Sequence, residues 1–102
     1  MAIGILFDIP GGTLEQYEEL NQKAFGDTKG PAENPSGLII HTAGATSGGW
    51  RIFDAWESKD DFQRFMEEYI MPAAEELGTP AFEPEIYELT NLIGAAVPAR
   101  TT

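Results

Sequence analysis

Apolar residues along the chain follow two spacings, and each spacing predicts a different kind of element. Helical spacing, with apolar residues three and four positions apart, runs over 14–25 and again over 58–77. Branched and aromatic runs bounded by Gly, Pro or Ser predict four strands, at 2–9, 38–43, 50–56 and 85–93. The resulting order is β-α-β-β-α-β. It predicts an α+β fold, a ferredoxin-like sandwich in which two helices cover one face of a four-stranded antiparallel sheet.

Polar residues and glycines predict where the helices begin and end. Thr13 starts a capping-box pattern, and Gly26 is the residue type that most often follows a helix. Ser58 is expected to cap the second helix and Gly78 to end it. Pro72 lies inside that helix. Because proline lacks a backbone donor and its ring collides with the preceding turn, a kink or a short break is expected beside it.

Segments rich in Gly, Pro and Asn separate the predicted elements. Residues 26–37 predict a loop that is either a lid or without fixed structure. Residues 44–49 join two strand-like runs and predict a hairpin. The chain has no internal repeat, so residues 1–94 are expected to form a single domain. The polar residues 95–102 are expected to form a flexible C-terminal tail.

Composition and charge exclude several classes of protein. Lys and Arg total 6 against 17 Asp and Glu, so the 102-residue chain carries a formal net charge of −11. A surface of that sign repels phosphate backbones and anionic lipid, so neither nucleic acid nor membrane is an expected partner. Cysteine is absent, which excludes disulfides and thiolate chemistry. The sequence contains neither a signal-peptide pattern nor an apolar run of membrane-spanning length, so a cytoplasmic protein is expected.

The predicted hairpin decides which chemical groups meet. If Ile39 pairs with Trp56, then His41 lies opposite Asp54 on one face of the sheet. The side chains that point to the opposite face of these two strands are all apolar and are expected to face the helices: Leu38, Ile40, Phe53 and Ala55. The other set would form a bare face made of Ile39, His41, Ala43, Trp50, Ile52, Asp54 and Trp56. Such a face is seldom left in water, so a two-fold partner is expected to pack sheet against sheet on it.

Three stretches carry a resemblance to a known superfamily. They are the turn at 10–12 (PGG), the run 56–62 (WESKDDF) and the segment 70–72 (IMP). Together with the element order, over about residues 3–92, they resemble the dimeric α/β-barrel superfamily and its antibiotic-biosynthesis-monooxygenase-like branch. The resemblance implies a homodimer. It also implies that each subunit holds a small aromatic or polyketide-like molecule in a pocket between its sheet and its helices.

The same resemblance implies a choice of activities. Members of the superfamily include oxygenases that use neither metal nor flavin, polyketide cyclases and haem-degrading enzymes. The haem-degrading branch takes its axial histidine from the helix that follows the strand ending here at Trp56, whereas 58–77 contains no histidine. Haem is therefore not expected, and neither is any other cofactor or resident metal.

Histidine is the residue type that titrates near neutral pH, and the only one in the chain is His41, which is therefore the candidate general base. Asp54 is the candidate carboxylate that orients it. The expected substrate-binding residues are Trp50, Trp56, Ile39, Ile52 and Tyr69. Tyr17 lies on the apolar face of its helix, where core packing is the simpler expectation and a phenol that reaches the mouth of the pocket is the alternative. A structural hydrogen bond at a dimer interface would also explain a histidine beside an aspartate.

Two classes of function follow from these residues. In the first, His41 removes a proton from an aromatic or polyketide-like substrate, and molecular oxygen reacts with the resulting carbanion, as in a cofactor-independent monooxygenase. The same carbanion closes a ring in the related hypothesis of a polyketide cyclase. In the second class, the protein is a non-catalytic ligand-binding or self-associating protein. Replacing His41 distinguishes the two, because only a catalytic role makes turnover depend on the imidazole.

Overall fold

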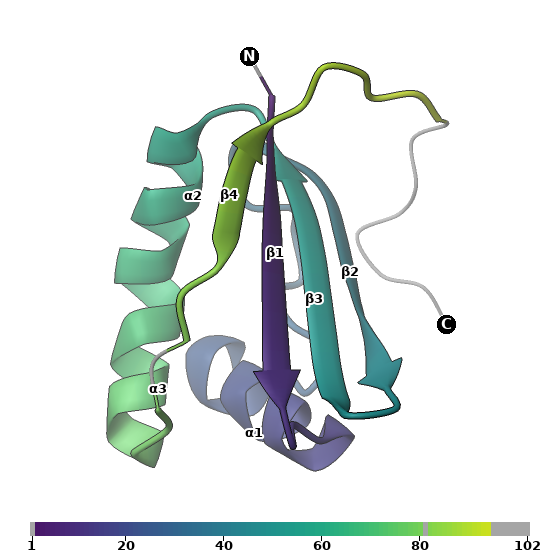
Figure 1. The fold of residues 1–102 in the computed structure, drawn as a ribbon. Helices are drawn as coiled ribbons and strands as arrows, with labels where there is room; N and C mark the ends of the chain where they lie inside the picture. Colours follow the sequence, from purple (N-terminus) through teal and green to yellow (C-terminus); the bar gives the residue numbers. More distant parts are fainter. Residues whose placement is uncertain (1, 81, 95–102) are drawn as a thin grey trace.

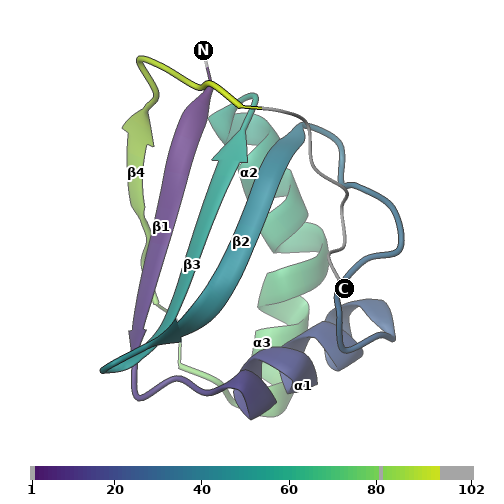
Figure 2. The ribbon, with the colours of Figure 1, turned by 90° about the vertical axis from the view of Figure 1, so that its right-hand side faces the viewer.

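The structure is a computed structural model and describes residues 2–80 and 82–94. Within these residues one antiparallel sheet has the strand order β2-β3-β1-β4, made of β1 (Ile3–Pro10), β2 (Leu38–Thr46), β3 (Gly49–Trp56) and β4 (Glu85–Glu88). The helices are α1 (Leu14–Phe25) and a continuous second helix of α2 (Lys59–Phe65), η1 (Met66–Ile70) and α3 (Met71–Leu77). The helices lie on one face of the sheet (Figures 1 and 2), which confirms the predicted ferredoxin-like α+β fold.

Both helices begin and end at the predicted residues. Thr13 caps α1 through a complete capping box, and Gly26 ends it with a φ of 74°, a conformation that favours glycine. The Ser58 hydroxyl accepts the Asp61 N–H at 3.1 Å and so caps α2. Gly78 ends α3 with a φ of 69°. These ends could be predicted because capping depends on residues only a few positions apart.

The second helix contains a wide turn where a break was expected. The chain stays helical through Pro72, and η1 is a π-helical turn closed by the Met71 N–H, which donates to the Met66 carbonyl five residues earlier. In an α-helix the proline ring would collide with the carbonyl four residues before it and would leave that carbonyl without a donor. The π turn widens the helix directly before the proline and relieves this crowding. The predicted break is therefore wrong, although the helix departs from α geometry directly before Pro72, next to the predicted position.

The β2-β3 hairpin brings His41 opposite Asp54, as the predicted register requires. The strands are longer than predicted, since pairing continues until only two turn residues, at 47 and 48, remain between them. At the other end the predicted pairing of Ile39 with Trp56 is wrong, because a β-bulge leaves Leu38 opposite Trp56. A bulge adds one residue to one strand and changes which side chains share a face.

Two tryptophans show which face of the sheet the helices cover. The Trp56 ring lies 5.2 Å from the Phe65 ring of α2, and the Trp50 ring lies 5.2 Å from the Tyr17 ring of α1, both measured between ring centroids. Trp56 is 1% exposed and Trp50 is 7% exposed. The face that carries both indoles is therefore the face beneath the helices.

The predicted assignment of the two sheet faces is wrong. Because side chains alternate along a strand, Ile52 and Asp54 share the covered face with the tryptophans, and His41 joins them opposite Asp54. The uncovered face instead carries Ile40, Phe53 and Ala55. The purely apolar set was expected beneath the helices. Instead, both indoles are buried there, and the paired polar groups satisfy each other on the same face.

The hydrophobic core lies between the sheet and the second helix. Its buried members are Ile3, Ile5, Trp56 and Phe62, and the side chains packed against them are Phe7, Leu38, Phe65 and Met66. Leu38 thus reaches the covered face as predicted, but it does so through the bulge. A fully buried side chain of this kind contributes about 1.5–3 kcal/mol. This cluster therefore holds β3 firmly in place, and β3 carries Asp54.

The last strand is shorter than predicted. β4 ends at Glu88 instead of continuing to residue 93, and the Leu89 N–H then donates to the Ala2 carbonyl at 2.9 Å. The tail expected at 95–102 lies outside the described residues. Within the ranges that are described, no helix combines the length and the apolar character needed to cross a membrane.

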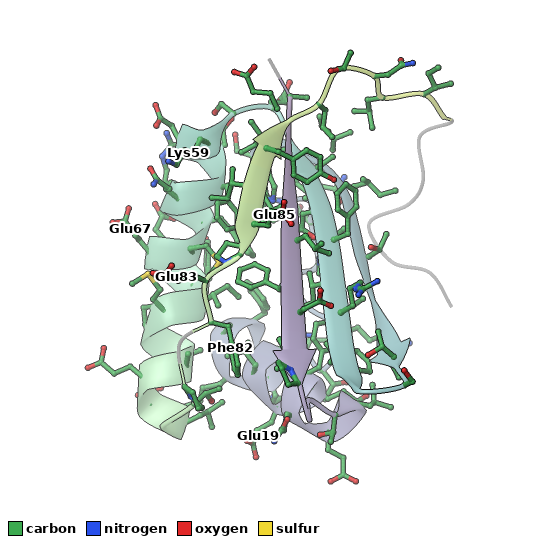
Figure 3. All side chains as sticks on the ribbon, viewed as in Figure 1. Glu19, Lys59, Glu67, Phe82, Glu83 and Glu85 are labelled. Atoms are coloured by element: carbon green, nitrogen blue, oxygen red, sulfur yellow. The ribbon has the colours of Figure 1, made fainter. Side chains whose placement is uncertain are left out.

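Charged side chains cover the outer surfaces of the helices. Figure 3 shows Lys59 and Glu67 pointing from the second helix away from the sheet, while Glu19 extends from α1. An ion pair of 3.4 Å joins Lys23 of α1 to Glu76 of α3, and both of its side chains are exposed. An exposed pair of this kind contributes about 0–1 kcal/mol, so packing and not charge holds the helices on the sheet.

Candidate functional site

The centre of the candidate site is a hydrogen bond between neighbouring strands. His41 of β2 and Asp54 of β3 lie opposite each other, and His41 Nδ1 is 2.6 Å from Asp54 Oδ1. An ionised carboxylate can only accept hydrogen bonds, so Nδ1 carries the hydrogen and donates it. In the neutral imidazole Nε2 is then left as an acceptor. The strand register therefore determines the tautomer of the only histidine.

The second carboxylate oxygen of Asp54 also has a donor. Trp56 Nε1 donates to Asp54 Oδ2 at 3.2 Å, in a buried position. Asp54 is only 6% exposed, and a buried carboxylate needs such partners to offset the loss of water. Trp56, which was predicted to bind substrate, thus packs in the core and holds the carboxylate with its indole N–H.

Tyr17 of α1 completes a chain of three side chains. Its hydroxyl lies 2.5 Å from His41 Nε2, and the two rings are nearly parallel, at an angle of 9° with centroids 6.1 Å apart. Because Nε2 is the acceptor in the tautomer that Asp54 favours, the Tyr17 hydroxyl donates. A hydroxyl, an imidazole and a carboxylate joined in this order form the same kind of relay as the triad of serine hydrolases, with a phenol in place of the serine.

The surroundings of Tyr17 keep its phenol protonated. Burial raises the pKa of Tyr17 above its ordinary 10.0, a side-chain hydrogen bond with Asn21 acts in the opposite direction, and the nearby charge of Asp54 raises the pKa further. The phenol is therefore a hydrogen-bond donor at neutral pH. A free phenolate at this position is disfavoured.

Trp50 packs on the other side of Tyr17 and has an unused donor. Its indole is tilted by 35° against the Tyr17 ring, and the side chain is more than nine-tenths buried. The Nε1 atom has no hydrogen-bond partner among the described residues. A buried donor without a partner costs about 1–3 kcal/mol, so an acceptor supplied by a ligand would stabilise this position.

The remaining predicted substrate-binding residues differ in where they lie relative to His41. Ile52 lies on the covered face of β3 between Trp50 and Asp54 and is half-buried. Ile39 lies in the bulge and is 40% exposed. Tyr69 packs against Phe25 and Phe65, with ring centroids 5.5 and 5.6 Å away, and joins the cluster only through those rings.

The candidate site is open to solvent at the imidazole. The His41 side chain is 36% exposed, whereas that of Asp54 is 9% exposed. Two open hollows lie elsewhere on the surface, one of about 430 Å³ beside Glu18, Lys23 and Leu77, and one of about 320 Å³ beside Thr42 and Arg51. Neither is lined by the His41–Asp54 pair, so the position of the site is argued from its hydrogen bonds. Among the described residues no three His, Asp or Glu side chains gather in a way that could hold a metal ion.

Two residues of this cluster were not predicted as site residues from the sequence. For Tyr17 core packing was the simpler expectation and the mouth of the pocket the alternative, and Asn21 lies within the helical spacing of 14–25 without being singled out. Asn21 is 5% exposed and donates to the Thr28 carbonyl at 2.9 Å, which ties the loop after α1 to the helix. The two residues lie four positions apart and therefore on one helix face, a signal that the sequence did contain.

Comparisons with known proteins agree with the fold. Neither a model of a protein family nor a curated protein sequence matches the chain. Among solved structures the chain is similar to a variant of SnoaB, a cofactor-independent oxygenase from Streptomyces nogalater, with a TM-score of 0.58 and 14% sequence identity. The match covers 92% of this chain and 97% of that one. At this identity the similarity establishes a shared fold, which is the fold that the resemblance to antibiotic-biosynthesis-monooxygenase-like proteins implied.

Proposed function

We propose that the protein binds a small aromatic or polyketide-like molecule beside His41 and oxidises it as a cofactor-independent monooxygenase. The observation that carries this proposal is the 2.6 Å hydrogen bond between His41 and Asp54, made by an imidazole whose side chain is 36% exposed. The fold shared with SnoaB, a cofactor-independent oxygenase, supports the class of reaction.

Proton removal is the step that these residues can perform. The carboxylate of Asp54 fixes the Nδ1–H tautomer and stabilises the positive imidazolium that forms when His41 takes up a proton. A substrate CH₂ group beside a carbonyl or a phenol ring then becomes a carbanion. The carbanion gives its electrons to molecular oxygen and forms a C–O bond. Uptake of a proton gives a hydroperoxide, and loss of water from it leaves a new carbonyl.

The walls of the proposed binding site come from the covered face of the sheet. Trp50 carries a buried, unpaired indole N–H on this face, while Ile52 supplies apolar surface on the same strand. Trp56 supports the site through Asp54. We assign Ile39 and Tyr69 to its margin, since both are at least 40% exposed.

We further propose that two copies of the chain form a homodimer through the uncovered face of the sheet. Figure 2 shows no described element over that face, which presents the half-buried Leu6, Ile40 and Phe53 together with Tyr87, 43% exposed. An apolar surface of this kind is seldom left in water by a monomer. A second copy would cover it while leaving His41, on the opposite face, open to a ligand.

Oxygen consumption tests the proposed activity. The chain is incubated with a panel of hydroquinones and cyclic 1,3-diketones under air, with a chelator and without added flavin, and dissolved oxygen is followed. A wild-type rate that falls by about 100-fold or more in His41→Gln, as expected for loss of a general base, supports the proposal. The matched control is Gln63→Ala, an exposed change on α2 that should leave the rate unaltered. Equal rates in wild type and His41→Gln, or product formed without oxygen, would contradict it.

A further inference from the structure

We propose that Tyr17, and not His41, is the residue that touches the substrate, and that it passes the substrate's proton to the imidazole. This inference rests on the proposed proton removal and adds the atom through which the proton enters the protein. It makes Tyr17 a catalytic residue and Asp54 a positioning residue. His41 is then the base that holds the proton after Tyr17 has passed it on.

Both ring nitrogens of His41 already take part in hydrogen bonds. Nδ1 donates to Asp54 at 2.6 Å, and the single lone pair of Nε2 accepts the Tyr17 hydroxyl at 2.5 Å. A substrate therefore cannot reach the basic nitrogen while this hydrogen bond is in place. The phenol oxygen, in contrast, has two lone pairs. It can therefore accept an acidic hydrogen of a ligand while its own hydrogen is donated to Nε2.

The hydrogen bonds of this chain become more exposed from Trp56 towards Tyr17. The bond from Trp56 to Asp54 is buried, the bond between Asp54 and His41 is partly buried, and the bond between His41 and Tyr17 is exposed. The exposed His41 and the half-buried Tyr17 thus form the end of the chain that a ligand from solvent meets, and the phenol oxygen is the atom there that can still accept a hydrogen bond. The indole of Trp50 packs against the same phenol and fixes its position on the covered face.

Burial raises the pKa of Tyr17, so its phenol is protonated at neutral pH. The proton transfer therefore does not start from a phenolate. The Tyr17 O–H bond breaks towards Nε2 while the phenol oxygen receives the substrate's proton, so Tyr17 is neutral before and after the step. The positive charge appears on the imidazole beside Asp54, and the negative charge stays on the substrate. The ligand must therefore be a proton donor, either a phenol or a carbon acid beside a carbonyl.

Hydrogen–deuterium exchange of a carbon acid tests this relay without any oxygen chemistry. The probe is 2-tetralone, an aromatic ketone with an acidic CH₂, in D₂O without oxygen, and proton NMR follows the loss of its CH₂ signal. Wild type is expected to accelerate the exchange, and Tyr17→Phe and His41→Gln are each expected to lower that acceleration by about 100-fold or more. Tyr87→Phe, which removes a phenol on the uncovered face, is the matched control and should exchange at the wild-type rate.

The outcomes separate the relay from the proposed function. If Tyr17→Phe exchanges at the wild-type rate while His41→Gln does not, the relay is wrong and His41 is the direct base. If wild type does not accelerate exchange at all, both the relay and the proposed proton removal fail. A loss in both variants, with the control unchanged, supports the relay.

A second measurement shows whether the variants are folded and detects the hydrogen bond between Tyr17 and His41 directly. Since His41 is the only histidine, protein labelled with ¹⁵N-histidine gives one pair of ring nitrogen signals. The Nε2 signal should shift in Tyr17→Phe and stay in place in Tyr87→Phe, while the dispersed backbone spectrum confirms that both variants are folded. An Nε2 signal that is unchanged in folded Tyr17→Phe would mean that the phenol does not bond to the imidazole in solution, and the relay would be rejected.

Discussion

Asp54 is buried, and yet each of its carboxylate oxygens has a donor from a different residue. His41 Nδ1 and Trp56 Nε1 approach the two oxygens at 2.6 and 3.2 Å. Hydrogen bonds to a charged group contribute about 1.5–3 kcal/mol each, and removing one partner leaves the other desolvated and unpaired. At the scale of single residues, the same carboxylate thus supports both the stability of the sheet and the tautomer of the imidazole.

Asp54→Asn is therefore expected to destabilise the protein by about 1–3 kcal/mol, because an amide group presents an N–H towards one of two donors. Urea unfolding followed by tryptophan fluorescence measures the change. The matched control is Asp8→Asn, whose carboxylate is 53% exposed and pairs with Arg51 on the uncovered face. That variant should lose at most about 1 kcal/mol. Equal losses in both variants would argue against a structural role for the buried carboxylate.

The pKa of Tyr17 predicts how stability depends on pH. A tyrosine whose pKa is raised by folding keeps its proton in the native protein after the unfolded chain has lost it. Its contribution is thus fully present below pH 10.0, the ordinary value for tyrosine, and is lost as the pH rises through the higher folded-state pKa. Unfolding free energies measured between about pH 9 and pH 11 should fall more steeply for wild type than for Tyr17→Phe. Parallel curves would contradict the raised pKa.

At the scale of elements, short-range capping and long-range packing act on different parts of the second helix. Ser58 caps it through a hydroxyl that accepts the Asp61 N–H and donates to the Asp61 carboxylate at 2.9 Å. The π turn that precedes Pro72 lies further along, where the ring of Phe65 packs on Trp56. The cap is thus formed by residues three positions apart, whereas Phe62 and Phe65 pack the helix against the strand that carries Asp54.

Ser58→Ala removes the cap and is expected to cost about 1 kcal/mol of unfolding free energy. Ser47→Ala, a change of the same size at the exposed hairpin turn, is the control and should stay within about 0.5 kcal/mol of wild type. Thermal unfolding by circular dichroism compares the two. A control as unstable as Ser58→Ala would show that the loss is not specific to the helix cap.

At the scale of the whole molecule, the two faces of the sheet have different tasks. The covered face holds the indoles and the Tyr17–His41–Asp54 chain, and the uncovered face presents apolar side chains around Phe53. With a net charge of −11, two copies also repel each other, and salt screens that repulsion. Apolar contact must therefore outweigh repulsion for the proposed dimer to form.

Phe53→Glu is expected to convert the proposed dimer to a monomer, because it buries an unpaired charge in the interface. Sedimentation at micromolar concentration in low and high salt measures the state, with more dimer expected at high salt for wild type. Met71→Glu, on an exposed helix position, is the control and should remain dimeric. A wild-type chain that sediments as a monomer in both salts would refute the dimer.

The sequence alone determined the elements of this protein, their order and most of their ends. These depend on residues within one or two turns of each other, as at Thr13, Gly26, Ser58 and Gly78. It also favoured one hairpin register in which His41 lies opposite Asp54, and the structure has that pairing, although a shift of one residue would have separated the two side chains.

Only the tertiary structure decided which face of the sheet the helices cover. That choice depends on how much surface each face buries against elements distant in the sequence. It brought Tyr17 of α1 to a histidine 24 positions away, and it turned two indoles inward that pattern reasoning had placed outside. The bulge beside Ile39 and the π turn before Pro72 likewise follow from packing, since each lets a strand or helix continue while its side chains adjust to their neighbours.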